Sequence, residues 1–169
     1  MKQKLLLTAF VCLLLAGCGK TSQVTFTTGE VMLTAEGPLF EGSNTVTGDY
    51  ASQLSAFLER QGATAADVKE ARLIRASLVA TDSAGFSNIS QLTLSMAAEK
   101  VEMQEVGVLN PVPQGSQQVE FKLAETQTAI ADFLKQPSIT FVTDANLLQD
   151  SPSNLSFKAL FEFQITLQQ

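Results

Sequence analysis

The sequence predicts a mainly β protein: an antiparallel two-sheet β-sandwich of about eight strands with two short connecting helices. The clearest support lies between Leu155 and Leu167, where every odd position is apolar and every even position except Leu160 is polar. Such alternation is typical of a long strand with one face in the core and one in water. The chain is 45% hydrophobic and 17% charged, which excludes intrinsic disorder and indicates a packed core.

Shorter runs of alternating or apolar residues, separated by turn signals, predict the other strands. These strands are expected at residues 24–33, 44–50, 69–81, 92–96, 100–109, 119–123 and 139–143. In the third strand, the more apolar set Ile74, Ala76, Leu78 and Ala80 is expected to face the core. In the fifth, Val101 and Met103 are expected to point inward.

The hydrophobic period changes from strand to helix in two places. The apolar residues within 52–60 share one helical face, so this segment is predicted to be a helix capped by Ser52. Residues Thr64–Asp67 have capping-box character and predict a further short helical turn. A second helix is expected at about 126–135, and it stops before Pro137.

The N-terminus has the pattern of a processing segment. A basic start, Met1–Lys4, precedes an apolar run, Leu5–Ala16. A helix of that length would span about 18 Å, too little for a bilayer core of about 30 Å but suitable for the apolar region of a signal peptide. Residues 1–17 are therefore expected to be a signal peptide that is removed, and an ordinary secretory signal is one interpretation.

The residues Leu15-Ala16-Gly17-Cys18 resemble the lipobox of bacterial lipoproteins. The resemblance implies that Cys18 is lipidated and that the protein is held at the lipid bilayer through the acylated Cys18. Gly19 occupies the position where Asp directs retention in the inner membrane, and residues 19–23 lack the acids of a surface-export signal. The resemblance therefore implies the outer membrane, with the periplasmic face favoured over the cell surface. The body is similar in overall order to small uncharacterised β-sandwich lipoproteins of Bacteroidota.

The expected organisation is a lipidated Cys and tether at 18–23, followed by a single β-sandwich domain at 24–169. Removal of residues 1–17 leaves a net charge of −8. A negative chain is repelled by nucleic acid, so no nucleic-acid partner is expected. The sequence has no histidine, and Cys12 and Cys18 both precede the domain. Imidazole-based and thiol-based catalysis are therefore excluded from the domain.

Two loops are candidates for ligand binding. The Pro-rich and Gly-containing segment Asn110–Ser116 is the strongest loop signal in the chain, and its polar side chains Asn110, Gln114 and Ser116 are candidate ligand contacts. The second loop, between the last two predicted strands, spans Asp144–Asn154. Either loop would lie at one end of the sandwich.

The second loop also carries hard oxygen ligands. Weak candidates for a structural calcium ion are Asp144, Asn146, Asp150, Ser153 and Asn154. A second, weaker set consists of Asp82, Ser83 and Asn88. The same residue types form the local hydrogen bonds of ordinary turns, so no cofactor is expected apart from this candidate calcium ion.

The preferred hypothesis is a non-enzymatic lipoprotein that acts through protein contacts, or as an accessory subunit, at the outer membrane. Its partner would be another protein of the cell envelope, and no catalytic residue is assigned. The alternative is a module that binds a glycan or another small molecule. A carboxylate-dependent hydrolase is third, because paired acids are available but the single tyrosine and absent tryptophan offer a poor platform for a sugar.

Overall fold

The computed structural model describes residues 21–168. The expected signal peptide and the lipobox with Cys18 lie outside the described residues, as does Gln169. Within the described part, no helix combines the length and the apolar character needed to cross a membrane.

The described chain forms nine strands, two short α-helices and one 3-10 turn. In order, the elements are β1 (Thr21–Ala35), β2 (Gly42–Ala51), α1 (Leu54–Arg60), η1 (Ala65–Asp67), β3 (Val68–Ala80), β4 (Ile89–Ala98), β5 (Val101–Leu109), β6 (Gln118–Glu120), β7 (Lys122–Leu123), α2 (Ile130–Leu134), β8 (Ser138–Leu147) and β9 (Leu155–Gln168). The strands follow the order β6-β3-β9-β1-β2-β8-β4-β5-β7, and every paired neighbour is antiparallel.

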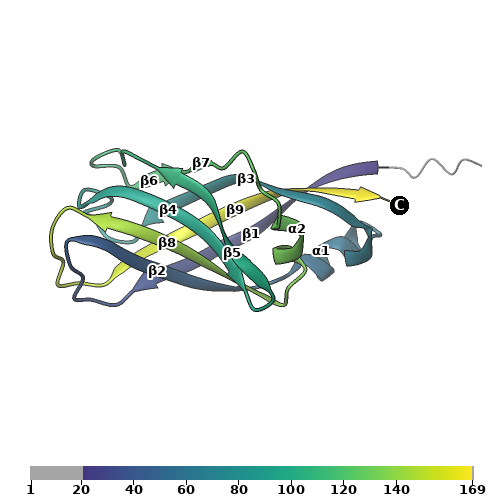
Figure 1. Cartoon of the computed structure of the whole chain (residues 1–169), viewed down its shortest axis with the longest axis horizontal. Helices are drawn as coiled ribbons and strands as arrows, with labels where there is room; N and C mark the ends of the chain where they lie inside the picture. The colour runs from purple at the N-terminus through teal and green to yellow at the C-terminus, as the bar shows by residue number, and fades with distance from the viewer. Residues whose placement is uncertain (1–20, 169) are drawn as a thin grey trace, which may run out of the picture.

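Two layers arise because β1 and β2 separate almost completely. They share the single register pair Thr34–Thr47, whereas β1 pairs with β9 along nearly its whole length. The nine strands thus remain one continuous sheet, which folds between β1 and β2 into a first layer, β6-β3-β9-β1, and a second layer, β2-β8-β4-β5-β7 (Figure 1). On the opposite side, the chain passes from β6 on β3 to β7 on β5 and so links the layers again. The predicted antiparallel β-sandwich with two short helices is confirmed.

Aromatic side chains fill the space between the sheets. Phe161 of the first sheet stacks on Phe141 of the second, with ring centroids 3.7 Å apart and planes inclined by 12°. Six of the seven expected inward residues of the last strand are buried, and the first of them, Leu155, is half-buried. The buried residues are Phe157, Ala159, Phe161, Phe163, Ile165 and Leu167. The alternation that predicted this strand is therefore confirmed.

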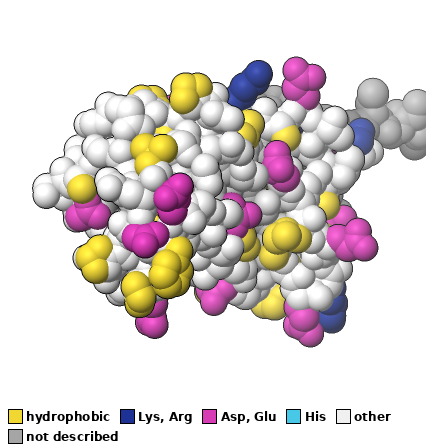
Figure 2. Space-filling model, turned by 60° about the vertical axis from the view of Figure 1, so that its left-hand side comes forward, with side chains coloured by type: hydrophobic (Ala, Val, Ile, Leu, Met, Phe, Trp, Pro, Cys, Tyr) yellow, Lys and Arg dark blue, Asp and Glu magenta, His cyan; other side chains and the backbone are white. Residues whose placement is uncertain are grey.

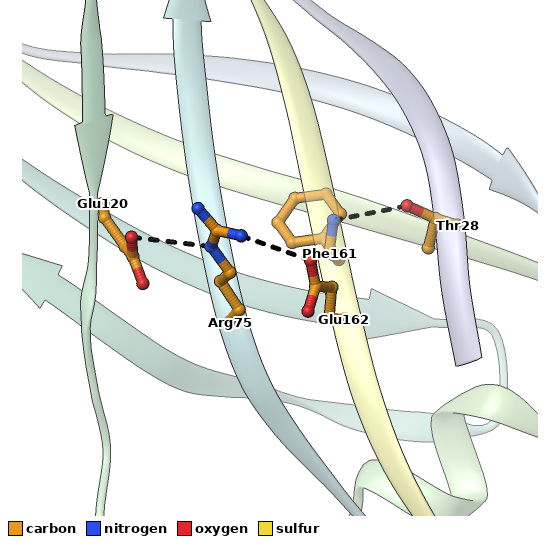
Figure 3. Close-up of polar contacts among 5 residues, drawn as sticks. All are labelled: Thr28, Arg75, Glu120, Phe161 and Glu162. Carbon is orange, nitrogen blue, oxygen red and sulfur yellow. Dashed lines mark hydrogen bonds and ion pairs between the residues drawn. The ribbon is translucent and has the colours of Figure 1, made fainter. Parts of the chain in front are cut away.

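A bulge in β1 interrupts its pairing with β9. The register shifts between Thr27 and Glu30, and Gly29 has φ +77°. Here the backbone N–H of Phe161 donates to the Thr28 hydroxyl at 3.4 Å (Figure 3). That hydroxyl in turn donates to the Gly29 carbonyl at 2.8 Å. The buried Thr28 side chain thus takes the place of a ladder partner at the bulge.

A second bulge, in β3, overturns one expectation about the core. The register shifts between Leu73 and Arg75, so Leu73 is buried and Ile74 is 44% exposed. The prediction that Ile74 faces the core was wrong, because the extra residue reverses the alternation. The Arg75 side chain then lies on the outer face of the sheet, with its guanidinium 3.5 Å from both Glu120 and Glu162 (Figure 3).

The prediction that Met103 points inward was also wrong. Irregularities in the β4–β5 pairing place Gln104 opposite the buried Met96, and the neighbouring Met103 is 65% exposed. At the start of β1, residues 21–23 are paired with residues 166–168 of β9. The first strand therefore takes in residues that were expected to belong to the tether.

Both helices cover the end of the sandwich from which β1 starts (Figure 1). Their buried residues are Leu54, Leu58, Ile130, Phe133 and Leu134. Each helix is shorter than predicted. The N-cap residue of α1 is Gln53, whose side chain makes no capping bond, and the expected cap, Ser52, accepts the Leu54 N–H through its hydroxyl at 3.4 Å. The capping box at η1 is confirmed: the Asp67 carboxylate accepts bonds from the Thr64 N–H at 2.7 Å and the Thr64 hydroxyl at 2.9 Å.

Candidate functional site

Four loops meet at the end of the sandwich opposite the two helices. They are residues 36–41, 81–88, 110–117 and 148–154, and each follows a strand that runs away from the helical end (Figure 1). We call this region the loop end. Antiparallel strand order alone brings these loops together, although they are far apart in the sequence.

Two of these loops are bonded to each other and carry exposed apolar side chains. Leu39 and Ser151 exchange backbone bonds of 2.8 and 2.9 Å. The Glu41 N–H donates to the Asp150 carboxylate at 2.8 Å. Phe40 is 66% exposed and Leu148 is 52% exposed, and we call this pair the apolar tip.

The backbone at Phe40 is held in place by one side chain. The Phe40 N–H donates to Asn44 Oδ1 at 3.3 Å, and Asn44 Nδ2 donates back to the Phe40 carbonyl at 2.7 Å. The exposed ring therefore stands on a hydrogen-bonded loop. Phe40 was not among the predicted site residues. The available signal was an aromatic residue inside a Gly-Pro turn segment and outside any alternating run.

The loop end is acidic. Its four loops contain Glu36, Glu41, Asp82 and Asp150, and none of them contains lysine or arginine. With this end turned forward, acidic and hydrophobic side chains are interspersed over the visible face, and the basic ones lie toward its margins (Figure 2). Such a surface attracts groups of positive charge and repels anions.

A hollow of about 530 Å³ lies between loop 81–88 and the start of β9, and we call it the loop hollow. Its apolar lining consists of Leu39, Ala84, Ile89, Leu147 and Leu155. Its polar lining includes Asp82, Ser83, Asn88, Ser151, Ser153 and Asn154. The structure thus brings the weaker predicted calcium set together with Ser153 and Asn154 of the stronger set.

Asn88 has an unusual position in this lining. Its Nδ2 donates to the Gln149 carbonyl at 2.8 Å, which fixes the orientation of the side-chain amide. Its Oδ1 is buried and has no hydrogen-bond partner within the described part of the chain. A buried acceptor of this kind is uncommon in folded proteins and calls for an explanation.

The predicted ligand contacts of loop 110–117 have structural partners. Asn110 Nδ2 donates to Gln91 Oε1 at 3.1 Å, and Gln114 Nε2 donates to the Ile89 carbonyl at 3.2 Å. The Ser116 carbonyl accepts the N–H of Phe86 at 3.1 Å. The loop lies at the expected end of the sandwich, but these three residues do not line the loop hollow.

The stronger calcium candidates are divided between two places. Asp144 and Asn146 belong to β8 and line a surface hollow of about 280 Å³ with Ser43, Gln91 and Thr93. The loop expected to begin at Asp144 begins after Leu147 instead, because β2 and β4 both pair with this part of β8.

Two of the other three candidates, Asp150 and Asn154, bind the backbone of loop 36–41, and the third, Ser153, lines the loop hollow. The side-chain oxygens of Asp150 and Asn154 accept the N–H groups of Glu41 and Gly37, at 2.8 and 2.9 Å. Within residues 21–168, no three Asp, Glu, His or Cys side chains gather as a group that could hold a metal ion.

No protein-family model and no curated protein matches the sequence. Among solved structures, a chain of infectious bursal disease virus, Gx strain, aligns with a TM-score of 0.42 at 15% identity, over 88% of this chain and 32% of that one. This chain thus spans about a third of the viral one. Desmodium yellow mottle tymovirus aligns at 8% identity over 99% and 96% of the two chains, with a TM-score of 0.31.

Mud crab tombus-like virus aligns at 10% identity over 89% and 90% of the two chains, with a TM-score of 0.27. Likenesses this distant do not bear on the function of this chain. The class defined by its own geometry is a two-sheet β-sandwich with an acidic, loop-built end.

Proposed function

We propose that the protein is a membrane-anchored, non-enzymatic lipoprotein that acts through protein contacts at its loop end, as an accessory subunit at the outer membrane. The observation that carries the proposal is the exposure of Phe40 on a hydrogen-bonded loop at the end opposite the start of β1. The anchor rests on the resemblance of residues 15–18 to a lipobox.

An exposed aromatic side chain on a hydrogen-bonded backbone suits a binding contact. Aromatic residues are enriched among those that dominate the energetics of protein interfaces. Ordering a loop on binding costs free energy, and the bonds from Asn44 and Ser151 have already ordered this one. Phe40 and Leu148 would therefore enter an apolar recess of the partner.

The charge around the apolar tip suggests the chemistry of that partner. Glu41 and Asp150 flank the tip, and the four loops lack basic residues. A complementary partner would carry lysine or arginine around its apolar recess, since opposite potentials guide association and disfavour wrong partners. The rate of association should then fall as salt concentration rises.

The expected anchor gives the loop end its orientation. Two residues separate Cys18 from Thr21, the first residue of β1. An acylated Cys18 would thus hold the helical end beside the bilayer and leave the loop end facing away from it. A partner in the periplasm could reach the apolar tip without displacing lipid.

Photo-crosslinking in intact membranes tests the proposed contact. A photoreactive amino acid at Phe40 should repeatedly capture one envelope protein, identified by mass spectrometry. The control places the same amino acid at Met103, which is equally exposed but lies on β5. Capture of the same proteins from both positions, or of no protein from Phe40, would contradict the proposal.

The anchor needs a separate experiment. Replacing Cys18 by serine should abolish labelling with a radioactive or alkyne-tagged fatty acid and release the protein from the membrane fraction. A Cys12→Ser variant is the matched control and should still be labelled. Unchanged labelling of the Cys18 variant would refute the lipoprotein assignment.

A further inference from the structure

We propose that the loop hollow is a binding site for a neutral, hydroxyl-rich small molecule of about one or two sugar rings. This site is distinct from the protein contact at the apolar tip. Its volume, about 530 Å³, falls within the range of about 300–1,000 Å³ that small-molecule sites occupy.

The lining of the hollow has two kinds of surface. Aliphatic side chains, among them Leu39, Ile89 and Leu155, offer contact to carbon–hydrogen groups. Serine, threonine and asparagine side chains from loops 81–88 and 148–154 offer hydroxyl and amide groups beside them. A sugar ring presents the same combination, with carbon–hydrogen faces and hydroxyl edges.

The charges in this region select against anions. The lining contains one carboxylate and neither lysine nor arginine. That carboxylate, Asp82, accepts the N–H groups of Ala84 at 2.8 Å and Gly85 at 3.1 Å, so it already stabilises its own turn. A phosphate or carboxylate ligand would find repulsion and no cationic partner, whereas a neutral ligand pays no such cost.

Asn88 lines the hollow, and its side-chain amide has one hydrogen-bonding atom without a partner in the described part of the chain. Its Nδ2 is already bound to the Gln149 carbonyl, so the group left over is the acceptor Oδ1. A hydroxyl group can donate to that oxygen and accept from the serine hydroxyls of the lining. Because neighbouring atoms cover Oδ1, this contact requires a local displacement of Asn88 or of the atoms beside it.

Ligand-observed NMR tests the site on the full chain in detergent micelles. The neutral probes are glucose, N-acetylglucosamine and maltose, and the anionic probes are glucuronate and glucose 6-phosphate. At least one neutral probe should give a saturable signal at millimolar concentrations and raise the unfolding temperature. Absence of saturable binding by all three neutral probes, or tighter binding of an anionic probe, would overturn the proposal.

Two variants locate the binding. Ser83→Phe places a ring in the hollow and should weaken the best neutral probe by about tenfold or more. Ser55→Phe makes the same change at an exposed position of α1, at the other end, and should leave the affinity within about twofold. Circular dichroism confirms that both variants are folded. Equal binding by Ser83→Phe and the parent chain would place the ligand elsewhere and overturn the proposal.

Crosslinking at Phe40 reports on the protein contact independently. Ser83→Phe is expected to bind the sugar about tenfold or more weakly and to keep the Phe40 crosslink.

Discussion

The side-chain amide of Gln127 forms two hydrogen bonds with the backbone of Leu73. Its Oε1 accepts the Leu73 N–H at 2.8 Å, and its Nε2 donates to the Leu73 carbonyl at 3.1 Å. β6 pairs with only residues 77–79 of β3, so this part of β3 lies beyond the end of its neighbouring strand. The backbone N–H and carbonyl of a strand residue both need hydrogen-bond partners. At Leu73 the side chain of Gln127 supplies both of them.

Replacing Gln127 by alanine should lower the free energy of unfolding by about 1–3 kcal/mol, because two backbone groups of Leu73 lose their partner. Urea denaturation followed by circular dichroism measures the change. Gln61→Ala, at an exposed position after α1, is the control and should have little effect. Equal midpoints for Gln127→Ala and the parent would show that the bonds contribute nothing.

The stability contribution of Asp67 should depend on pH. Hydrogen bonds from the Thr64 N–H and hydroxyl hold the pKa of the Asp67 carboxyl below its usual range. A folded-state pKa below the unfolded value stabilises the protein above the unfolded pKa of about 3.9, and this contribution is lost as the pH falls through the folded value.

Asp67→Ala should therefore unfold at a lower temperature than the parent at pH 7, and the difference should shrink at pH 2–3. Thermal unfolding at both pH values measures it. Asp132→Ala supplies a control for the removal of one exposed charge. A difference that stays constant or grows toward low pH would contradict the assigned role.

Gly48 lies where β2 passes close to β1. A Cβ at this position would collide with the Met32 carbonyl and lie 2.6 Å from Leu33 Cδ2. Gly48→Ala should therefore cost about 1–3 kcal/mol, as overpacking of a dense core does. Ser43→Ala, at an exposed position of the same strand, should be nearly neutral in urea denaturation. An unchanged free energy of unfolding in Gly48→Ala would mean that β1 can move away from β2 without loss of stability.

Thr143 offers a route to higher stability. Its side chain is fully buried in β8, and its hydroxyl has no hydrogen-bond partner within the described residues. Thr143→Val removes that hydroxyl at nearly constant volume and should raise the free energy of unfolding by about 1 kcal/mol.

Thr140→Val is the matched control, and its effect should have the opposite sign. The Thr140 hydroxyl donates to the Asp49 carboxylate at 2.6 Å, so this variant should be less stable than the parent. Urea midpoints of the two variants provide the comparison. Loss of stability in Thr143→Val would indicate that its hydroxyl has a polar role.

The pattern of β9 could be predicted because alternation needs no knowledge of the partner strands. The position of Ile74 could not, since the bulge beside it is defined by the register between β3 and β9. The same holds for Asp144, which reads as a loop residue until its pairing with Thr45 and Thr93 is known. The local sequence pattern identifies a strand. Its ends and the direction of its side chains depend on the register with the neighbouring strands.

The candidate site shows the same division. The sequence indicated Asp82, Ser83 and Asn88 as one set of polar residues, but the hollow also requires Leu155 and Asn154 from a distant segment. The exposure of Phe40 likewise depends on the bonded loops 36–41 and 148–154. Such juxtapositions arise from topology, and a single sequence carries no local signal for them.

The pairing of β1 with β9 also determines when the first strand can reach its final contacts during folding. The two strands are matched from Thr21–Gln168 to Ala35–Leu155, so a central pair of the sandwich joins the two ends of the described chain. During synthesis, β1 must wait for nearly all the remaining residues before its main partner exists. Contacts of such long sequence separation form slowly, on a scale of about milliseconds to seconds in all-β domains. Until β9 is available, the apolar side chains of β1 remain exposed to solvent. A chaperone that binds unfolded chains can protect β1 during this period.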